Sequence, residues 1–114
     1  MPYREFMHVD DLADAALFLM QNYDGDEIIN AGVGGDITIK ALAELVQNIV
    51  DFDGDVVWDS SMPDGTPRKL MDVSRISKLG WKSRIELEDG IQAVYESYLR
   101  EHGISMYDIE YVII

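Results

Sequence analysis

One stretch decides how this chain folds: Pro63-Asp64-Gly65-Thr66-Pro67-Arg68-Lys69. Proline fixes φ and removes a backbone donor, so two prolines in this stretch exclude a regular helix or a central strand. The stretch therefore predicts a rigid turn. Because the turn ends in Arg68 and Lys69, it is suited to presenting cations to an anionic ligand.

The rest of the chain is acidic. The 114 residues include 22 Asp and Glu against 9 Lys and Arg, a formal net charge of −13. Such a surface repels phosphate backbones, which argues against nucleic acid as a partner. Most of the bases fall between residues 68 and 84, whereas residues 1–66 hold only Arg4 and Lys40. Two interpretations stay open: a solvated helix face, or a local anion site within an acidic body.

Length and composition set further limits. The chain is long enough for one domain with its own core. It has no cysteine, which excludes disulfides, a thiolate nucleophile and cysteine-based metal sites. No apolar run approaches the roughly 20 residues needed to cross a bilayer, and no signal peptide is recognisable. We therefore expect a cytoplasmic protein without a membrane partner.

Hydrophobic periodicity predicts alternating strands and helices. Helices are expected over 10–22, 38–50, 74–80 and 88–102, and strands over 27–31, 56–58 and 111–114. Residues 4–9 are expected to form a short strand or an extended entry to the first helix. Expected helix caps are Asp10 or Asp11, Thr38 and Ser74 at the starts, with Gly80 and Gly103 at the ends. This order predicts an α/β fold with a small sheet.

Three other motifs have simple structural explanations. Gly32-Val33-Gly34-Gly35 lacks the third glycine of a dinucleotide-binding loop, since Ile37 stands there, and favours a tight turn. The stretch 51–55 lacks the glycine and glutamate positions of a calcium loop and favours a surface turn. His8, beside Asp10, is typical of a local hydrogen-bonding residue, although an acid–base role stays open.

The sequence contains no reductase machinery. No Tyr is followed four residues later by Lys, and neither a complete glycine-rich phosphate loop nor a nucleophile elbow is present. We therefore expect no catalytic, cofactor-binding or metal-binding residues in the chain. What remains is a candidate binding site formed by Arg4 and the loop 63–69. Arg can bind a diphosphate through two donors at once, and Lys adds a point charge.

At these residues the sequence resembles a known family, the GDP-L-fucose synthases. The matching stretches are 4–13 (REFMHVDDLA), 30–34 with Thr38 and Ile39, 63–72 (PDGTPRKLMD), Ser74-Arg75 and 79–81. The first is shared by many extended short-chain dehydrogenase/reductases, whereas PDGTPRK is specific. The resemblance covers residues 2–102 and leaves the strand-prone tail 103–114 unmatched.

The resemblance implies a role in binding rather than in chemistry. Members of the family use NADPH to epimerise and reduce GDP-4-keto-6-deoxymannose, and their C-terminal part helps to hold the GDP-sugar. By position, Arg4, Asp64 and Lys69 resemble substrate contacts, with Arg68 as a further candidate. The family's catalytic residues and NADP-binding loop belong to the preceding Rossmann domain, which is absent from this sequence.

We therefore expect residues 1–102 to be the C-terminal substrate-binding portion of such an enzyme, inactive in isolation. One alternative is a non-catalytic nucleotide-sugar-binding module that complements a separate Rossmann chain. Another is a truncated gene product without function. Because apolar faces and strand edges would lack their Rossmann cover, self-association is expected, with the strand 111–114 as one contact.

Overall fold

The computed structural model describes residues 1–103, and they form a small α/β arrangement, as predicted. The chain opens with strand β1 (Tyr3–Arg4) and helix α1 (Val9–Asn22). The predicted end of α1 is confirmed, but its predicted cap is wrong. His8 caps the helix, because its Nδ1 accepts the Asp10 N–H at 3.0 Å. Asp10 and Asp11 instead occupy the first turn, where carboxylates favour the helix dipole.

Helix α2 (Ile39–Ile49) begins where the sequence predicts it. Thr38 Oγ1 accepts the Ala41 N–H at 3.1 Å, which confirms Thr38 as the cap. The two residues before the helix form strand β2 (Ile37–Thr38).

Three strands of two residues each make the sheet, in the order β2-β1-β3. Central strand β1 runs antiparallel to β2 and parallel to β3 (Arg68–Lys69). A strand at the end of the proline-rich loop was not predicted. It is possible because β3 lies at the sheet edge, and because Pro67, which has no N–H to donate, contributes its carbonyl to the Tyr3 N–H at 2.9 Å.

Other predicted strands are wrong. Residues 27–31 and 56–58 form no strand, whereas the short strand or extended entry expected over 4–9 appears as strand β1, which ends at Arg4, followed by residues 5–8 without helix or strand. Within residues 1–103 these two segments have no neighbouring strand to pair with, and an unpaired strand is not stable in water. Ile28 and Val57 are accordingly more than four-fifths exposed, at 84% and 87%. The tail expected to form a strand lies outside the described residues.

The last two helices follow the prediction closely. Helix α3 (Ser74–Leu79) ends at Gly80, whose φ of 107° is a left-handed conformation that favours glycine. Ser74 is the first helical residue rather than the cap, and its N–H donates to Asp72 Oδ1 at 2.9 Å. Helix α4 (Leu87–Glu101) starts one residue early and is followed by Gly103 at φ 65°, as expected.

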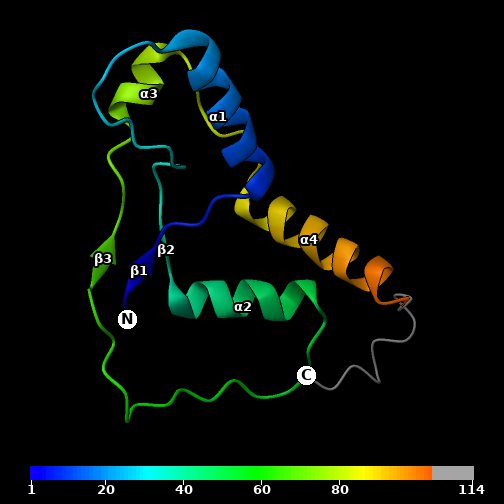
Figure 1. The fold of residues 1–114 in the computed structure, drawn as a ribbon. Coiled ribbons are helices and arrows are strands. Elements are labelled where there is room, and N and C mark those ends of the chain that lie inside the picture. Colours follow the sequence, from blue (N-terminus) through cyan, green and yellow to red (C-terminus); the bar gives the residue numbers. More distant parts are fainter. Residues whose placement is uncertain (104–114) are drawn as a thin grey trace.

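The core joins α1 to α3, which lie beside each other at one end of the molecule (Figure 1). Its fully buried members are Ala15 from α1, Ile76 from α3 and Trp81 just after α3. Partly buried apolar side chains surround them: Met7, Phe18, Leu19, Ile29, Ala31 and Val73. Met7 follows β1 and Val73 follows β3, so the core holds segments that flank the strands.

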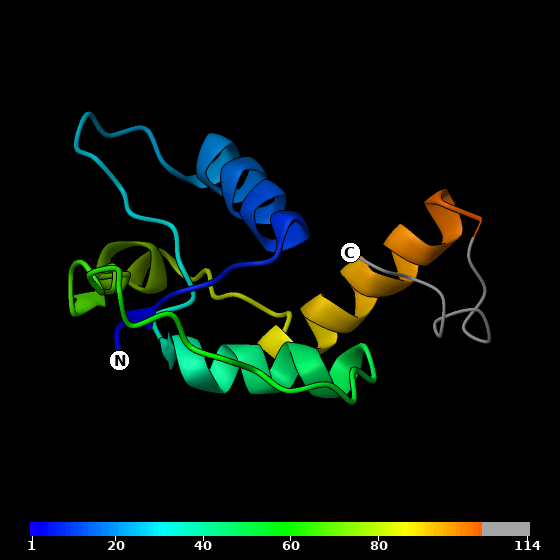
Figure 2. The ribbon, with the colours of Figure 1, turned by 90° about the horizontal axis from the view of Figure 1, so that it is seen from below.

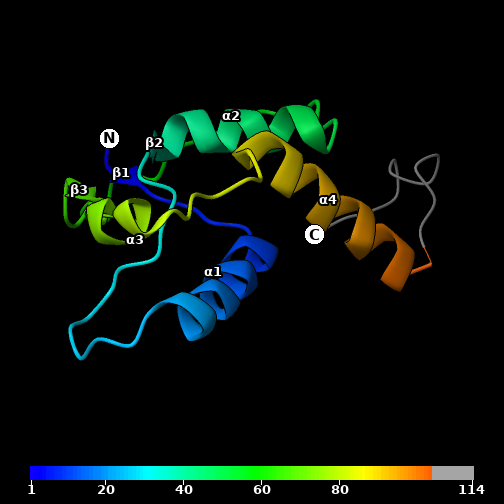
Figure 3. The ribbon, with the colours of Figure 1, turned by 90° about the horizontal axis from the view of Figure 1, so that it is seen from above.

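Helices α2 and α4 contact each other, and α4 runs on away from the sheet (Figures 2 and 3). Although α2 carries the predicted apolar stripe, none of its residues is buried. In the part of the chain that the structure describes, α2 therefore has only incomplete cover for its apolar side.

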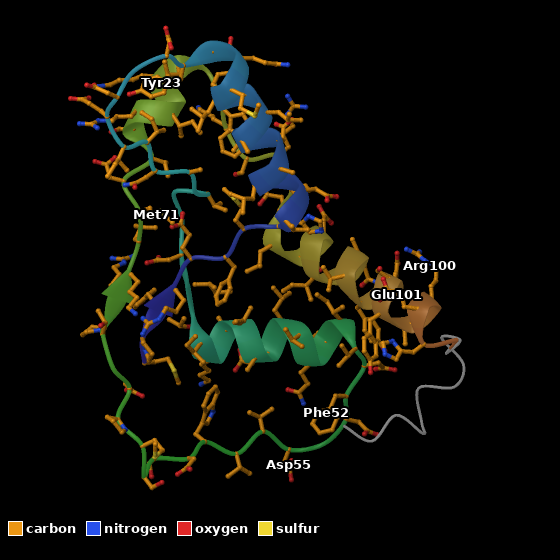
Figure 4. The ribbon with its side chains drawn as sticks, viewed as in Figure 1. Tyr23, Phe52, Asp55, Met71, Arg100 and Glu101 are labelled. Carbon is orange, nitrogen blue, oxygen red and sulfur yellow. The ribbon has the colours of Figure 1, made fainter. Side chains whose placement is uncertain are left out.

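A long segment without helix, residues 55–72, runs from the end of α2 back to the sheet and on to α3. Figure 4 shows Phe52 and Asp55 near the end of α2, and Met71 on the stretch beyond β3. Every residue from 55 to 72 is exposed, including Val57, Trp58 and Met62. This segment carries the loop 63–69.

Candidate functional site

The sheet brings Arg4 and the loop 63–69 together. Arg4 pairs with Lys69 in the parallel register of β1 and β3. The Arg4 Nη1 group also donates to the Thr66 carbonyl at 2.8 Å and to the Tyr3 carbonyl at 2.6 Å. Two regions separated by 62 residues in sequence thus form one cluster, and Arg4 fixes the loop by its side chain as well as its backbone.

The register assigns the candidate residues to two faces of the sheet. Successive side chains of a strand project to opposite faces, whereas directly paired residues project to the same face. Arg4 therefore shares a face with Ile37 and Lys69, while Tyr3 shares the other face with Thr38 and Arg68. Two cations of the candidate site, Arg4 and Lys69, stand next to each other.

Arg68 is engaged inside the chain. Its Nε and Nη2 atoms donate to the two Asp36 carboxylate oxygens at 2.5 and 2.9 Å, and its guanidinium lies 4.8 Å from the centre of the Tyr3 ring. The hydrogen bond from Arg68 holds the pKa of Asp36 below its usual value, and the Asp36 carboxylate raises the pKa of Arg68. Arg68 as a ligand contact stays a prediction, because the structure gives its donors another partner.

Asp64 and Lys69 are both exposed. Within residues 1–103, the side chains of both lack a hydrogen-bond or ion-pair partner. These side chains are therefore accessible to a ligand, and their role as contacts stays a prediction.

A shallow hollow of about 270 Å³ lies beside Arg4. Its lining is mainly apolar, with three charged residues among Arg4, Phe6, Val33, Gly35, Asp36, Ile37, Ser83, Ile85, Glu86 and Leu87. The hollow combines mainly apolar walls with one cation, Arg4, and two carboxylates, of which Asp36 is paired with Arg68. Such a lining fits a molecule with a flat or apolar part, whose charged part would lie at Arg4.

Two carboxylates that the sequence did not single out for the site organise its surroundings. Asp11 is buried and accepts hydrogen bonds from the N–H groups of Arg84, at 3.2 Å, and Ile85, at 3.0 Å, which ties α1 to the wall of the hollow. Glu5 accepts from the N–H groups of Gly34 and Met71. Neither role could be recognised from charge or residue spacing, because each carboxylate binds backbone N–H groups that are distant in sequence.

The remaining motifs behave as structural features. Residues 51–55 form a largely exposed turn region, and His8 is a helix cap. Gly32-Val33-Gly34-Gly35 forms the turn before β2. In the described part of the chain, no group of three or more His, Cys, Asp or Glu side chains is arranged to hold a metal ion. No helix among these residues is long and apolar enough to cross a membrane.

Comparison with known proteins shows which family shares this sequence. The chain is 57% identical over 98 residues to a protein of Oryza sativa subsp. japonica named Probable GDP-L-fucose synthase 1, with 86% of this chain and 30% of that protein covered. The chain corresponds to the C-terminal part of GDP-L-fucose synthases. It spans 30% of the length of that relative, so it matches a part of the GDP-L-fucose synthase sequence and not the whole. No model of a known protein family matches the chain.

Solved structures agree with the match to GDP-L-fucose synthases. A GDP-6-OMe-4-keto-L-xylo-heptose reductase from C. jejuni is 46% identical, with a TM-score of 0.80 over 88% of this chain and 32% of that one. A GDP-mannoheptose C4 reductase from Campylobacter jejuni, solved with NADP bound, is 50% identical, with a TM-score of 0.74 over 85% of this chain and 32% of that one. The chain thus shares its fold with part of the GDP-sugar reductases.

Proposed function

We propose that this chain is the GDP-sugar-binding part of a GDP-L-fucose synthase-like enzyme that acts on GDP-4-keto-6-deoxymannose. The observation that carries the proposal is the pairing of Arg4 with Lys69, beside a hollow with apolar walls. Two adjacent cations in a chain of net charge −13 favour a compact anion such as a diphosphate over an extended one. We choose GDP as the nucleotide of the proposed ligand because the names of the two solved reductases specify GDP-linked sugars.

Within this proposal, Arg4 and Lys69 contact the diphosphate and Asp64 accepts hydrogen bonds from the ligand. Arg68 acts through Asp36, by linking β3 to the residue before β2 across the central strand β1. NADP belongs to the part of the family that these residues do not match. The chain alone is proposed to bind the GDP-sugar and not to reduce it.

Calorimetry tests the binding. We expect heat on titration with GDP-fucose, weakened by salt because exposed charges carry the contact. Lys69→Gln should lower the affinity by about tenfold. Lys78→Gln is the matched control, because Lys78 is an exposed lysine of α3 outside the candidate site, and should leave the affinity within about twofold. No heat at millimolar ligand contradicts the proposal.

A kinetic assay tests the lack of activity. The purified chain, mixed with NADPH and GDP-4-keto-6-deoxymannose, is expected to leave the NADPH absorbance unchanged. Steady oxidation of NADPH that depends on the sugar would overturn this part of the proposal.

A second candidate function is a module that binds a separate Rossmann-fold chain. The observation in its favour is the set of exposed apolar side chains on α1 and on residues 55–72, which include Val9, Met20 and Val57. The test mixes the chain with the cofactor-binding two thirds of a GDP-L-fucose synthase and measures mass by light scattering. A one-to-one complex with sugar-dependent NADPH oxidation supports it, and two unassociated species exclude it.

A further inference from the structure

Glu5 bridges two segments that lie far from it in sequence. Its Oε2 atom accepts the Gly34 N–H at 2.7 Å, across 29 residues, and its Oε1 atom accepts the Met71 N–H at 3.1 Å, across 66 residues. Each carboxylate oxygen thus has a separate backbone partner. Hydrogen bonds to an ionised acceptor are about twice as strong as neutral ones.

The two bonds continue the sheet beyond the point where its strands end. Glu5 follows Arg4, the last residue of β1; Gly34 precedes β2; and Met71 follows β3. Backbone pairing covers only two residues of each strand. Past that point, the Glu5 side chain replaces the missing backbone bonds on both sides of β1.

The space around the carboxylate is closely fitted. A Cβ atom on residue 32 would lie 2.8 Å from Glu5 Oε2, so any side chain there would displace the carboxylate. The close approach of Glu5 therefore explains why a glycine occupies position 32, without any dinucleotide-binding loop. The glycine turn accommodates Glu5.

The charge of Glu5 is unfavourable for an anion site. A carboxylate adjacent in sequence to Arg4 repels the same anion that Arg4 and Lys69 attract. Any benefit of Glu5 to binding must therefore come from where it places other groups.

We propose that Glu5 is a positioning residue for the candidate anion site: by holding Gly34 and Met71 to β1, it keeps Lys69 next to Arg4. This inference rests on the proposed GDP-sugar binding. The bond at Met71 lies two residues beyond Lys69, so its loss frees the end of β3 while the loop remains attached through Arg4 and Thr66.

The decisive test is the variant Glu5→Gln, because its lost charge and its lost hydrogen bond change the affinity for GDP in opposite directions. Removal of the negative charge alone raises the affinity for GDP, whereas loss of one of the two amide bonds lowers it. We expect calorimetry with GDP to show an affinity lower by about three- to tenfold. Glu44→Gln, an exposed glutamate of α2, removes the same charge and is the control, with an expected change within about twofold. A higher affinity in Glu5→Gln overturns the inference.

A double-mutant cycle separates positioning from a general loss of structure. If Glu5 acts through Lys69, Glu5→Gln has no further effect on GDP affinity in a Lys69→Gln background. Equal losses in both backgrounds overturn the inference.

Amide hydrogen exchange tests the Glu5 bonds to Gly34 and Met71 independently of ligand binding. If the chain does not bind GDP, that finding rejects the proposed function and leaves this test of Glu5 intact. In Glu5→Gln, exchange at Gly34 or Met71 should accelerate by about tenfold, while exchange at Ser77 in the core helix α3 stays unchanged. Unchanged exchange at both Gly34 and Met71 overturns the inference, whatever the binding data show.

Discussion

The two tryptophans of the chain have opposite environments. Trp81 is 4% exposed, packs with Ala15 and Ile76, and donates its Nε1–H to Asp14 Oδ2 at 2.8 Å. Trp58 is 45% exposed, in a segment where every residue from 55 to 72 is exposed. The difference shows that burial here depends on which partner the described chain supplies, and it supplies one only to Trp81.

The largest effect is expected where the buried region is most closely packed. Ile76 is 1% exposed, so Ile76→Ala leaves a cavity and should lower the free energy of unfolding by about 2–5 kcal/mol. Urea unfolding followed by circular dichroism measures it. Val57→Ala, at an 87% exposed site, is the control and should change stability by less than about 0.5 kcal/mol. Equal losses would remove the contrast between the two regions.

A smaller effect is expected for the polar contact of Trp81. Asp14→Ala leaves the indole N–H of the buried Trp81 without its acceptor and should lower the free energy of unfolding by about 1–3 kcal/mol. Asp59→Ala provides the comparison, because among residues 1–103 Asp59 accepts hydrogen bonds from Ser61 alone, within its own turn. If both variants unfold at the same urea concentration, the Trp81 hydrogen bond does not contribute to stability.

Substitutions in the exposed segment 55–72 should change the self-association of the chain and not its free energy of unfolding. We expect light scattering to show a mass that rises with concentration, because the exposed apolar side chains of 55–72 can bury each other between copies. Val57→Glu should weaken this association several-fold. Ser60→Glu adds the same charge to the same segment without removing an apolar group and is the control. A clean monomer of the unmodified chain at high concentration would contradict the prediction.

The smallest effect concerns the ion pair between Asp36 and Arg68, which holds the exposed segment to the residue before β2. The hydrogen bond from Arg68 lowers the pKa of Asp36 below its ordinary 3.8, so the pair stabilises the folded chain above about pH 4. That contribution is lost as the pH falls through the lowered pKa. Melting temperatures over an acid series should therefore fall less steeply in Arg68→Gln. The difference is small because the Arg68 side chain is 60% exposed. Parallel curves would exclude the pair as a contributor.

The sequence predicted the elements whose signals are local. Thr38 caps α2, Gly80 ends α3 and Asn22 ends α1, because caps and periodic apolar faces depend on residues a few positions apart. The expected strands 27–31 and 56–58 were wrong, since strand formation depends on a partner that local sequence does not specify.

The candidate site was predicted in part. Arg4 and Lys69 were selected by residue type and resemblance, and the structure brings them together. The roles of Glu5 and Asp11 could not be predicted, because their partners are backbone amides 29 to 74 residues away. The pairing of Arg68 with Asp36 was likewise invisible, since it depends on the register of three short strands.

The position of β1 has a consequence for the order of folding. The central strand of the sheet occupies residues 3 and 4, whereas the carbonyl that Arg4 holds in the loop lies 62 residues further on. Closing so long a segment costs entropy before any contact repays it. Pairings of high sequence separation therefore form late. Strand β1, although first among these elements in sequence, is therefore expected to be completed last, and the candidate cluster of Arg4 and Lys69 to assemble only after α1 and α2, which lie between its two halves, have formed.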